Sequence, residues 1–364
     1  MRLAGSPSTL APNTVWYPLP VSEPESLPHY DLVIVGAGPV GLEAAIRAKR
    51  AGLRYLVLEK GAVVEAIVRY PTYMTFFTTS ERLEIGGHPL VASTDKPTRK
   101  EALDYYRRVT QNDDLAVRTF TQVTTITPLE DGTFRVATRN DRGVTGEIHT
   151  HAVAVATGYF ANPKLLGIPG EDLPTVSHYY SEAHPFYGRN VTIVGAGSSA
   201  ADTALDLYRA GARVTIVHRG PDFRHSLKYW IRPNIENRVK EGSIVAHFHT
   251  TVCEITPDAV IADKRAPGQP AQRIAIPTDQ TFLLTGYFAA PELLRAAGVR
   301  IDPETLSAEL DPETFETNVP GLYCIGSAGF GTRTSDVFIE NGLVHVAMAM
   351  RDIVAKIGRV RAVT

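Results

Sequence analysis

The sequence predicts an α/β protein built from two similar units, each a parallel sheet with crossover helices. The chain has 364 residues, which is long for one hydrophobic core and suits about two domains. Two stretches read almost as copies: LVIVGAGPVGLEAAIRAKRAGLRYLVLEKG at 32–61 and VTIVGAGSSAADTALDLYRAGARVTIVHRG at 191–220. Each has the pattern strand, glycine turn, helix, strand, which is typical of a Rossmann-like dinucleotide-binding domain.

Apolar runs separated by turn residues predict the remaining elements. Besides the two glycine turns, buried runs are expected at 32–35, 55–59, 151–158, 191–194, 281–287 and 321–326. We expect a helix at 42–49 and an amphipathic helix at 336–357. The polar stretch ADKRAPGQPAQ, 262–272, is typical of a hairpin tip. The alternation of strands and helices indicates parallel sheets.

These elements divide the chain into a tail and two domains. Residues 1–29 are rich in proline and serine and predict a flexible tail. A discontinuous first domain takes 30–162 and 284–364, and the second domain, 163–283, is inserted into it. Only two crossovers, near 158–169 and 281–291, would then join the domains. We expect the domains to rotate about them, because hinges lie at element ends.

The first unit has the pattern of an FAD site. Gly36, Gly38 and Gly41 form GxGxxG directly after a strand and before a helix. The three glycines permit, in order, the tight turn, the approach of a pyrophosphate to the backbone, and close helix–strand packing. The helix N-terminus offers free N–H groups to the phosphates. Glu59 ends the second strand, where a carboxylate accepts hydrogen bonds from the ribose hydroxyls.

The second unit predicts a site for NADPH. Its motif is the variant GxGxxA, formed by Gly195, Gly197 and Ala200. At the strand end that matches Glu59, this unit has His218 and Arg219 instead of an acid. A carboxylate would repel the 2′-phosphate of NADPH, whereas a guanidinium pairs with it. The two strand ends therefore assign FAD to the first unit and NADPH to the second, and hydride would pass from NADPH to the flavin.

Composition excludes several classes of function. The formal net charge of −2 provides no basic field for nucleic acid, and no apolar run is long enough to span a membrane. The two cysteines, Cys253 and Cys324, form no CxxC, which fits the reducing cytoplasm. The scattered histidines make no metal pattern, so no metal is expected. We expect a cytoplasmic homo-oligomer that meets a small-molecule or small-protein electron acceptor.

The chain resembles thioredoxin reductase-like flavoproteins, and more closely the bacillithiol-disulfide reductase family (the YpdA type). HRGPDFR, 218–224, is similar to the thioredoxin reductase NADPH signature HRRxxxR, and LLTGY, 283–287, looks like the return crossover into the FAD domain. The stretches PTYMTFFTTSERLEIGG, PTRKEALDYYRRV, GIPGEDLPTVSHYYSEAHPFYGRNV, LKYWIRPNIENRV and FIENGLVH carry the closer resemblance, which runs from about residue 30 to 357. It implies FAD, NADPH and a cytosolic low-molecular-weight disulfide such as bacillithiol disulfide as the acceptor.

The resemblance and the glycine motifs together complete a set of cofactor-binding candidates. Segment 75–81 is expected to fold over the flavin ring, the backbone of Val123 to meet the adenine, and Gly342 to bring the terminal helix close to the flavin. Beyond the residues already named, the set contains Pro39, Val40, Lys60, Thr78, Thr79, Val123, Ala156, Thr157, Gly158, Ser198, Ser199, Arg224, Gly326, Ser327 and Gly342. No catalytic side chain is assigned, because the cofactors carry the chemistry.

Three departures from the family pattern keep the acceptor open. Val40 replaces the cysteine that the bacillithiol-disulfide reductase family usually carries in the first glycine motif. The CxxC of thioredoxin reductases is missing, and Gly326–Ser327 replaces their usual Gly–Asp. Disulfide exchange needs a thiolate, which valine lacks. The alternative is therefore an NADPH:acceptor reductase serving ferredoxin, a quinone or oxygen. A flavin monooxygenase is a weaker alternative because its signature FxGxxxHxxx(W/F) is missing, and a non-catalytic NADPH sensor is weaker still.

Overall fold

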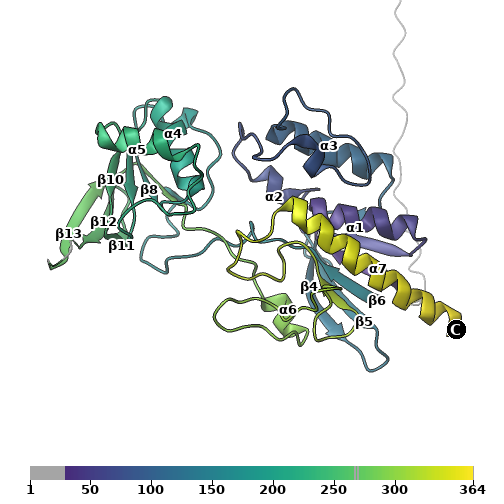
Figure 1. The fold of residues 1–364 in the computed structure, drawn as a ribbon. Helices are drawn as coiled ribbons and strands as arrows, with labels where there is room; N and C mark the ends of the chain where they lie inside the picture. Colours follow the sequence, from purple (N-terminus) through teal and green to yellow (C-terminus); the bar gives the residue numbers. More distant parts are fainter. Residues whose placement is uncertain (1–28, 266–267, 269, 364) are drawn as a thin grey trace, which may run out of the picture.

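The computed structural model describes residues 29–265, 268 and 270–363. Two lobes are visible in Figure 1, joined by two lengths of chain. The larger lobe contains the first glycine turn and the C-terminal helix, and the smaller lobe contains the second glycine turn. The insertion of one unit into the other as a separate domain stays a prediction. The exact boundaries at 162/163 and 283/284 remain predictions, and the predicted tail lies outside the described residues except for His29, which begins the first strand.

The larger lobe is built on a sheet with the strand order β3-β2-β1-β6-β5-β4, in which β15 also pairs with β6. The strands are β1 (His29–Val35), β2 (Tyr55–Leu58), β3 (Val117–Arg118), β4 (Thr121–Pro128), β5 (Phe134–Asn140), β6 (Thr145–Val155) and β15 (Leu322–Cys324). Strands β3, β2, β1, β6 and β15 pair in parallel, and β4, β5 and β6 form an antiparallel meander. The expected parallel sheet is thus present in this lobe, and the antiparallel meander is an addition that the sequence did not predict. The short turns 129–133 and 141–144 leave no room for crossover helices, so those strands must return antiparallel.

Both faces of this sheet are buried. Side chains alternate along β1, so that Leu32 and Ile34 face one side and Val33 and Val35 the other. The first face is covered by α1 (Pro39–Arg50), α3 (Arg99–Asn112) and α7 (Ile339–Val363), and the second by the meander and α6 (Glu292–Ala296). Two short elements, α2 (Glu65–Val68) and the 3₁₀ turn η1 (Ser80–Leu83), lie before α3. The terminal helix was predicted at 336–357 and instead covers 339–363.

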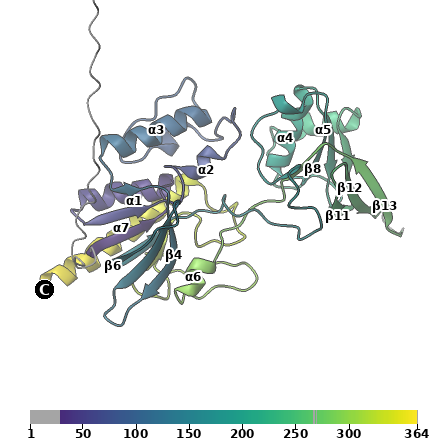
Figure 2. The same ribbon diagram turned by 180° about the vertical axis from the view of Figure 1, so that it is seen from behind.

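The smaller lobe repeats the plan on a sheet with the order β10-β9-β8-β14-β7, and all of its pairings are parallel. Its strands are β7 (Val176–Ser177), β8 (Asn190–Val194), β9 (Arg213–Val217), β10 (Val245–His247) and β14 (Gln280–Leu283). Helices α4 (Ser198–Arg209) and α5 (Arg232–Lys240) pack on one face, and the 3₁₀ turn η2 (His184–Phe186) precedes β8. The other face is covered by an antiparallel sheet of β11 (Thr250–Ile255), β12 (Ala259–Lys264) and β13 (Gln272–Pro277), as Figure 2 shows from behind.

Two expectations for this lobe have clear outcomes. The polar stretch 262–272 joins β12 to β13, which pair antiparallel, so the predicted hairpin is confirmed. The expected strand at 281–287 ends earlier, at Leu283. It ends there because the chain must leave the sheet: Thr285 and Gly286 instead bond to Lys164 in the other connecting segment.

Candidate functional site

In the first glycine turn, two glycines are closely packed and the one between them faces open space. Gly36 has φ +109°, and a Cβ there would stand 2.6 Å from the carbonyl oxygen of Ala156. A Cβ on Gly41 would stand 1.9 Å from the carbonyl oxygen of Gly36, so helix α1 packs too closely for any side chain. A Cβ on Gly38, in contrast, would meet no atom within 4 Å. The turn therefore presents bare backbone to an open volume at the N-terminus of α1, which is the form of a pyrophosphate cradle.

Glu59 follows directly after β2 and is fixed before any ligand arrives. Its carboxylate accepts hydrogen bonds from the backbone N–H of Ala37 at 2.8 Å and of Gly61 at 2.9 Å, and the side chain is buried. Each carboxylate oxygen has a second lone pair free for a ribose hydroxyl. Val123 lies two residues after Thr121, whose N–H donates to the carbonyl oxygen of Glu59. The adenosine end of the predicted FAD site is thus assembled from β2 and β4.

Three segments that are far apart in the sequence meet beside the first glycine turn. The ATG segment, 156–158, follows β6; the Gly326–Ser327 turn follows β15; and Gly342 lies in the first turn of α7. A Cβ on Gly158 would stand 3.9 Å from Oγ of Ser327. The side chain of Val40 lies between the Gly326–Ser327 turn and Gly342. A Cβ added to Gly326 would be 3.2 Å from the Val40 side chain, and a Cβ added to Gly342 would be 2.9 Å from it.

The remaining candidates of the first lobe lie in less specific surroundings. Thr79 precedes the 3₁₀ turn η1, Thr78 is half-buried beside it, and Lys60 is exposed. Of the two phenylalanines in segment 75–81, Phe76 is a core residue. Phe77 is 44% exposed and contacts the other lobe instead, with its ring centroid 6.0 Å from that of Trp230. The Phe77 ring therefore makes an interdomain contact, and the expected position of segment 75–81 over the flavin stays a prediction.

The second glycine turn has the same geometry with one difference. Gly195 has φ +140°, and a Cβ there would stand 2.4 Å from the carbonyl oxygen of Leu284. A Cβ on Gly197 would meet only the side chain of Arg224, at 3.9 Å. Ala200 is accommodated, since its Cβ would lie 3.5 Å from a Cβ on Gly195. Ser198 and Ser199 begin α4 here, and Oγ of Ser198 accepts the N–H of Lys228 at 3.3 Å.

Cations surround this second turn. His218 follows β9 directly, and its ring lies over Gly220, where a Cβ would stand 2.7 Å from Nε2. Burial, Arg219 and Arg224 together lower the pKa of His218. The backbone N–H of Arg224 donates to the carbonyl oxygen of Ala196 at 3.0 Å, which brings this arginine back to the glycine turn. The cations named from the sequence pattern thus lie near the second glycine turn, and their contact with NADPH stays a prediction.

Lys164 is a cation that the motif analysis missed. It lies in the connecting segment after β6, where its N–H donates to Gly286 at 2.9 Å and its carbonyl oxygen accepts from Oγ1 of Thr285 at 2.7 Å. Burial, Arg224 and Arg219 lower the pKa of its ammonium group, so the three cations are close enough to repel one another. No sequence motif predicts a role for this lysine. It lies near Arg219 and Arg224 because the two connecting segments pair in the folded protein.

Neither cysteine replaces the thiol that Val40 lacks. Cys324 is fully buried in β15, and burial raises the pKa of its thiol to about 12, so it stays protonated. Cys253 lies in β11 of the smaller lobe, where its thiol donates to the carbonyl oxygen of Thr251 at 3.4 Å. The position of Cys324 inside the sheet is that of a small structural side chain. A mixed disulfide at the flavin would need a thiolate that neither Val40 nor the protonated Cys324 provides.

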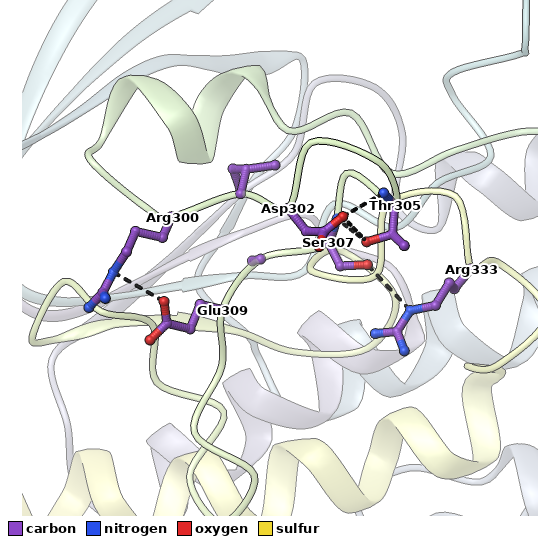
Figure 3. Close-up of a pocket in the computed structure, with 8 residues that line it drawn as sticks. Arg300, Asp302, Thr305, Ser307, Glu309 and Arg333 are labelled. Atoms are coloured by element: carbon purple, nitrogen blue, oxygen red, sulfur yellow. Dashed lines mark hydrogen bonds and ion pairs between the residues drawn. The ribbon is translucent and has the colours of Figure 1, made fainter.

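A hollow of about 570 Å³ lies elsewhere in the larger lobe (Figure 3). Its polar groups already satisfy one another: Arg300 pairs with Glu309 at 3.1 Å, Asp302 accepts from Thr305, and Arg333 donates to Ser307 at 3.3 Å. It contains none of the predicted cofactor residues. Within the described ranges, no group of three or more His, Cys, Asp or Glu side chains is placed to hold a metal ion.

Comparison with known proteins decides the family. The family model for pyridine nucleotide-disulphide oxidoreductases matches residues 33–326, from the first glycine turn to the Gly326 turn. The chain belongs to this family. Bacilliredoxin reductase Bdr of Bacillus subtilis is 40% identical over 313 residues, which cover 86% of this chain and 94% of that protein. The structure of bacillithiol disulfide reductase Bdr from Bacillus cereus superposes with a TM-score of 0.86 and 36% identity, covering 90% of this chain and 99% of that one.

The predicted fold class and cofactors are confirmed at the same time. Thioredoxin reductase of T. acidophilum, 21% identical, superposes with a TM-score of 0.67 over 90% of this chain and 98% of that one, which shows the thioredoxin reductase-like fold alone. As a member of the pyridine nucleotide-disulphide oxidoreductases, the chain is a flavoprotein oxidoreductase that uses FAD and NADPH. A Cβ on Gly38 would meet no atom within 4 Å, and one on Gly197 only the side chain of Arg224, so the backbone of each turn is free to accept one pyrophosphate. None of the helices in the described part of the chain is long and apolar enough to cross a membrane.

Proposed function

We propose that this flavoprotein passes electrons from NADPH through FAD to a low-molecular-weight disulfide, such as bacillithiol disulfide. The reaction consumes NADPH, one proton and the disulfide, and yields NADP⁺ and two thiols. The observation that carries this proposal is the 40% identity to bacilliredoxin reductase over 94% of that protein's length. Because the identity covers both lobes, it includes both cofactor units and the segments that connect them.

The cofactor contacts follow from the two glycine turns. FAD would place its pyrophosphate on Gly36–Gly41 and its ribose hydroxyls on Glu59, with the flavin toward Gly158, Ser327 and Gly342. NADPH would place its pyrophosphate on Gly195–Gly197 and its 2′-phosphate on His218 and Arg219. Support comes from the open space at each central glycine and from the surplus of cations at the second turn alone.

Val40 favours a second candidate, a reductase whose flavin donates directly to ferredoxin, a quinone or oxygen. The Val40 side chain lies against Gly326 and Gly342, so a cysteine at this position would stand beside the flavin turn. Valine makes disulfide reduction depend on direct transfer from the reduced flavin to sulfur. The acceptor is therefore the property in which the two candidates differ.

An anaerobic experiment separates the two candidates. The bound flavin is reduced with NADPH, and bacillithiol disulfide, ferredoxin, a quinone or oxygen is then added separately while flavin reoxidation is followed. Fast reoxidation by the disulfide alone supports the first candidate, and fast reoxidation only by the other acceptors supports the second. The variant Val40→Cys is expected to accelerate disulfide turnover, and the double variant Cys253→Ser, Cys324→Ser to retain wild-type turnover with every acceptor.

We propose in addition that the protein works in the reducing cytoplasm as a homo-oligomer. The free state of Cys253 and Cys324 supports the compartment. Phe338 and Val344, at the beginning of α7, are 58% and 55% exposed, and such apolar side chains support self-association. Light scattering of the purified holoenzyme measures the oligomeric state directly, and a monomer at micromolar concentration would contradict the proposal.

A further inference from the structure

The second glycine turn is flanked by cations from both sides, and one of them is unexplained. Arg224 approaches from the β9 side, held by the hydrogen bond from its N–H to Ala196. Lys164 approaches from the β14 side. Its Cδ would lie 4.0 Å from a Cβ on Gly286, two residues beyond Leu284, whose carbonyl oxygen touches Gly195.

These cations have no acidic partner. Among the described residues, no ion pair is formed by the half-buried Lys164 or by the exposed Arg219 and Arg224. The half-buried Arg232, Arg238 and Lys356, in contrast, are each paired with a carboxylate. Like charges brought together without a carboxylate raise the free energy of the folded state. An anion bound among them would remove that cost. The arrangement therefore calls for a ligand with negative charge at the turn itself.

The position of Lys164 distinguishes which anion it meets. The 2′-phosphate of NADPH is expected at the end of β9, beside His218 and Arg219, because the acid of the matching strand end would contact the ribose there. Lys164 comes instead from the β14 side, beside the glycine turn at the N-terminus of α4, where the pyrophosphate is expected. A lysine is a flexible point charge that suits such a phosphate.

We propose that Lys164 binds the pyrophosphate of the nicotinamide dinucleotide. Lys164 would contact it from the β14 side of the second glycine turn and Arg224 from the β9 side. This inference rests on the proposed placement of NADPH in the second unit. It adds a binding residue from the segment that connects the two lobes, outside the glycine motif and outside the HRGPDFR stretch. The backbone of Lys164 is held by Gly286 and Thr285, so its side chain starts from a fixed point.

The test compares two nucleotides that differ in the pyrophosphate. NADP⁺ carries the pyrophosphate and the 2′-phosphate, whereas adenosine 2′-monophosphate carries the 2′-phosphate alone. Binding of each to the FAD-loaded holoenzyme is measured by calorimetry, with competition for the weaker ligand. Lys164→Met is expected to weaken NADP⁺ binding about tenfold, as for the loss of one charge-assisted bond, and to leave adenosine 2′-monophosphate unchanged.

Matched variants make each outcome decisive. Arg219→Met is expected to weaken both ligands, and Lys164→Arg, which keeps the charge, to retain most of the NADP⁺ affinity. Flavin content and melting temperature show that each variant is folded. Unchanged NADP⁺ binding by Lys164→Met would overturn the inference, and so would an equal loss for both ligands, which would put Lys164 at the 2′-phosphate. Failure of the wild type to bind NADP⁺ at all would instead overturn the proposed function.

Discussion

Alanine in place of Gly38 should weaken FAD binding while leaving the fold intact. Gly38 has φ −71° and ψ 174°, which any L residue adopts, and a Cβ there would meet no protein atom. The free energy of unfolding of the apoprotein should therefore rise slightly, by about 0.4–1 kcal/mol. The added methyl stands where a phosphate must come within about 2.9 Å of a backbone N–H. Losing one such bond costs about 1.5–3 kcal/mol, or about a ten- to hundredfold weaker FAD binding.

The assay separates the cofactor from the fold. Flavin is removed, apoprotein stability is measured by denaturant unfolding, and FAD is titrated back while its fluorescence is followed. Gly41→Ala is the contrasting variant: its Cβ would stand 1.9 Å from the carbonyl oxygen of Gly36, so the apoprotein itself should be destabilised. Gly197→Ala is the matched control, which should weaken NADPH and spare FAD. Wild-type FAD affinity in a folded Gly38→Ala protein would refute the placement of the pyrophosphate.

Two further predictions concern contacts that hold the elements together. Tyr323→Phe should lower the free energy of unfolding by about 1–2 kcal/mol, because the buried hydroxyl donates to Asp352 at 2.6 Å and ties β15 to α7; an unchanged denaturation midpoint would contradict this. In the interdomain contact, the Lys228 ammonium lies over the Phe77 ring beside Trp230, and burial lowers the pKa of Lys228 to about 7. This pKa lies below the unfolded value of about 10.4, so the folded state loses the proton as the pH rises through about 7, and the cation–π contact weakens. With the other tryptophan replaced by phenylalanine, Trp230 emission should titrate near pH 7, and Lys228→Met should abolish that titration; a titration that persists would assign it to another group.

Local rules were sufficient for the two cofactor units. A dinucleotide-binding turn needs glycines that expose the backbone to the phosphates. The end of the following strand needs an acid for a ribose or a cation for a 2′-phosphate. Both requirements are met by residues within one short stretch of the sequence. Glu59 and His218 therefore occupy the positions that the spacing predicted, directly after β2 and β9. The same holds for the hairpin at 262–272, because a polar turn between short alternating strands leaves little choice of pairing. The expected rotation of the two domains stays a prediction.

Tertiary structure decided what depends on residues distant in the chain. The sequence by itself determined the family, the two nucleotides and the missing thiol at Val40, since each is a property of a motif. It missed the antiparallel meander, the contact of Phe77 with Trp230, and Lys164. Each of these features depends on which distant segments contact one another in the folded protein. Such contacts are stabilised by many weak interactions, and a local sequence motif does not predict them. The pairing of two connecting segments, 120 or so residues apart, is what carries a lysine to the second glycine turn.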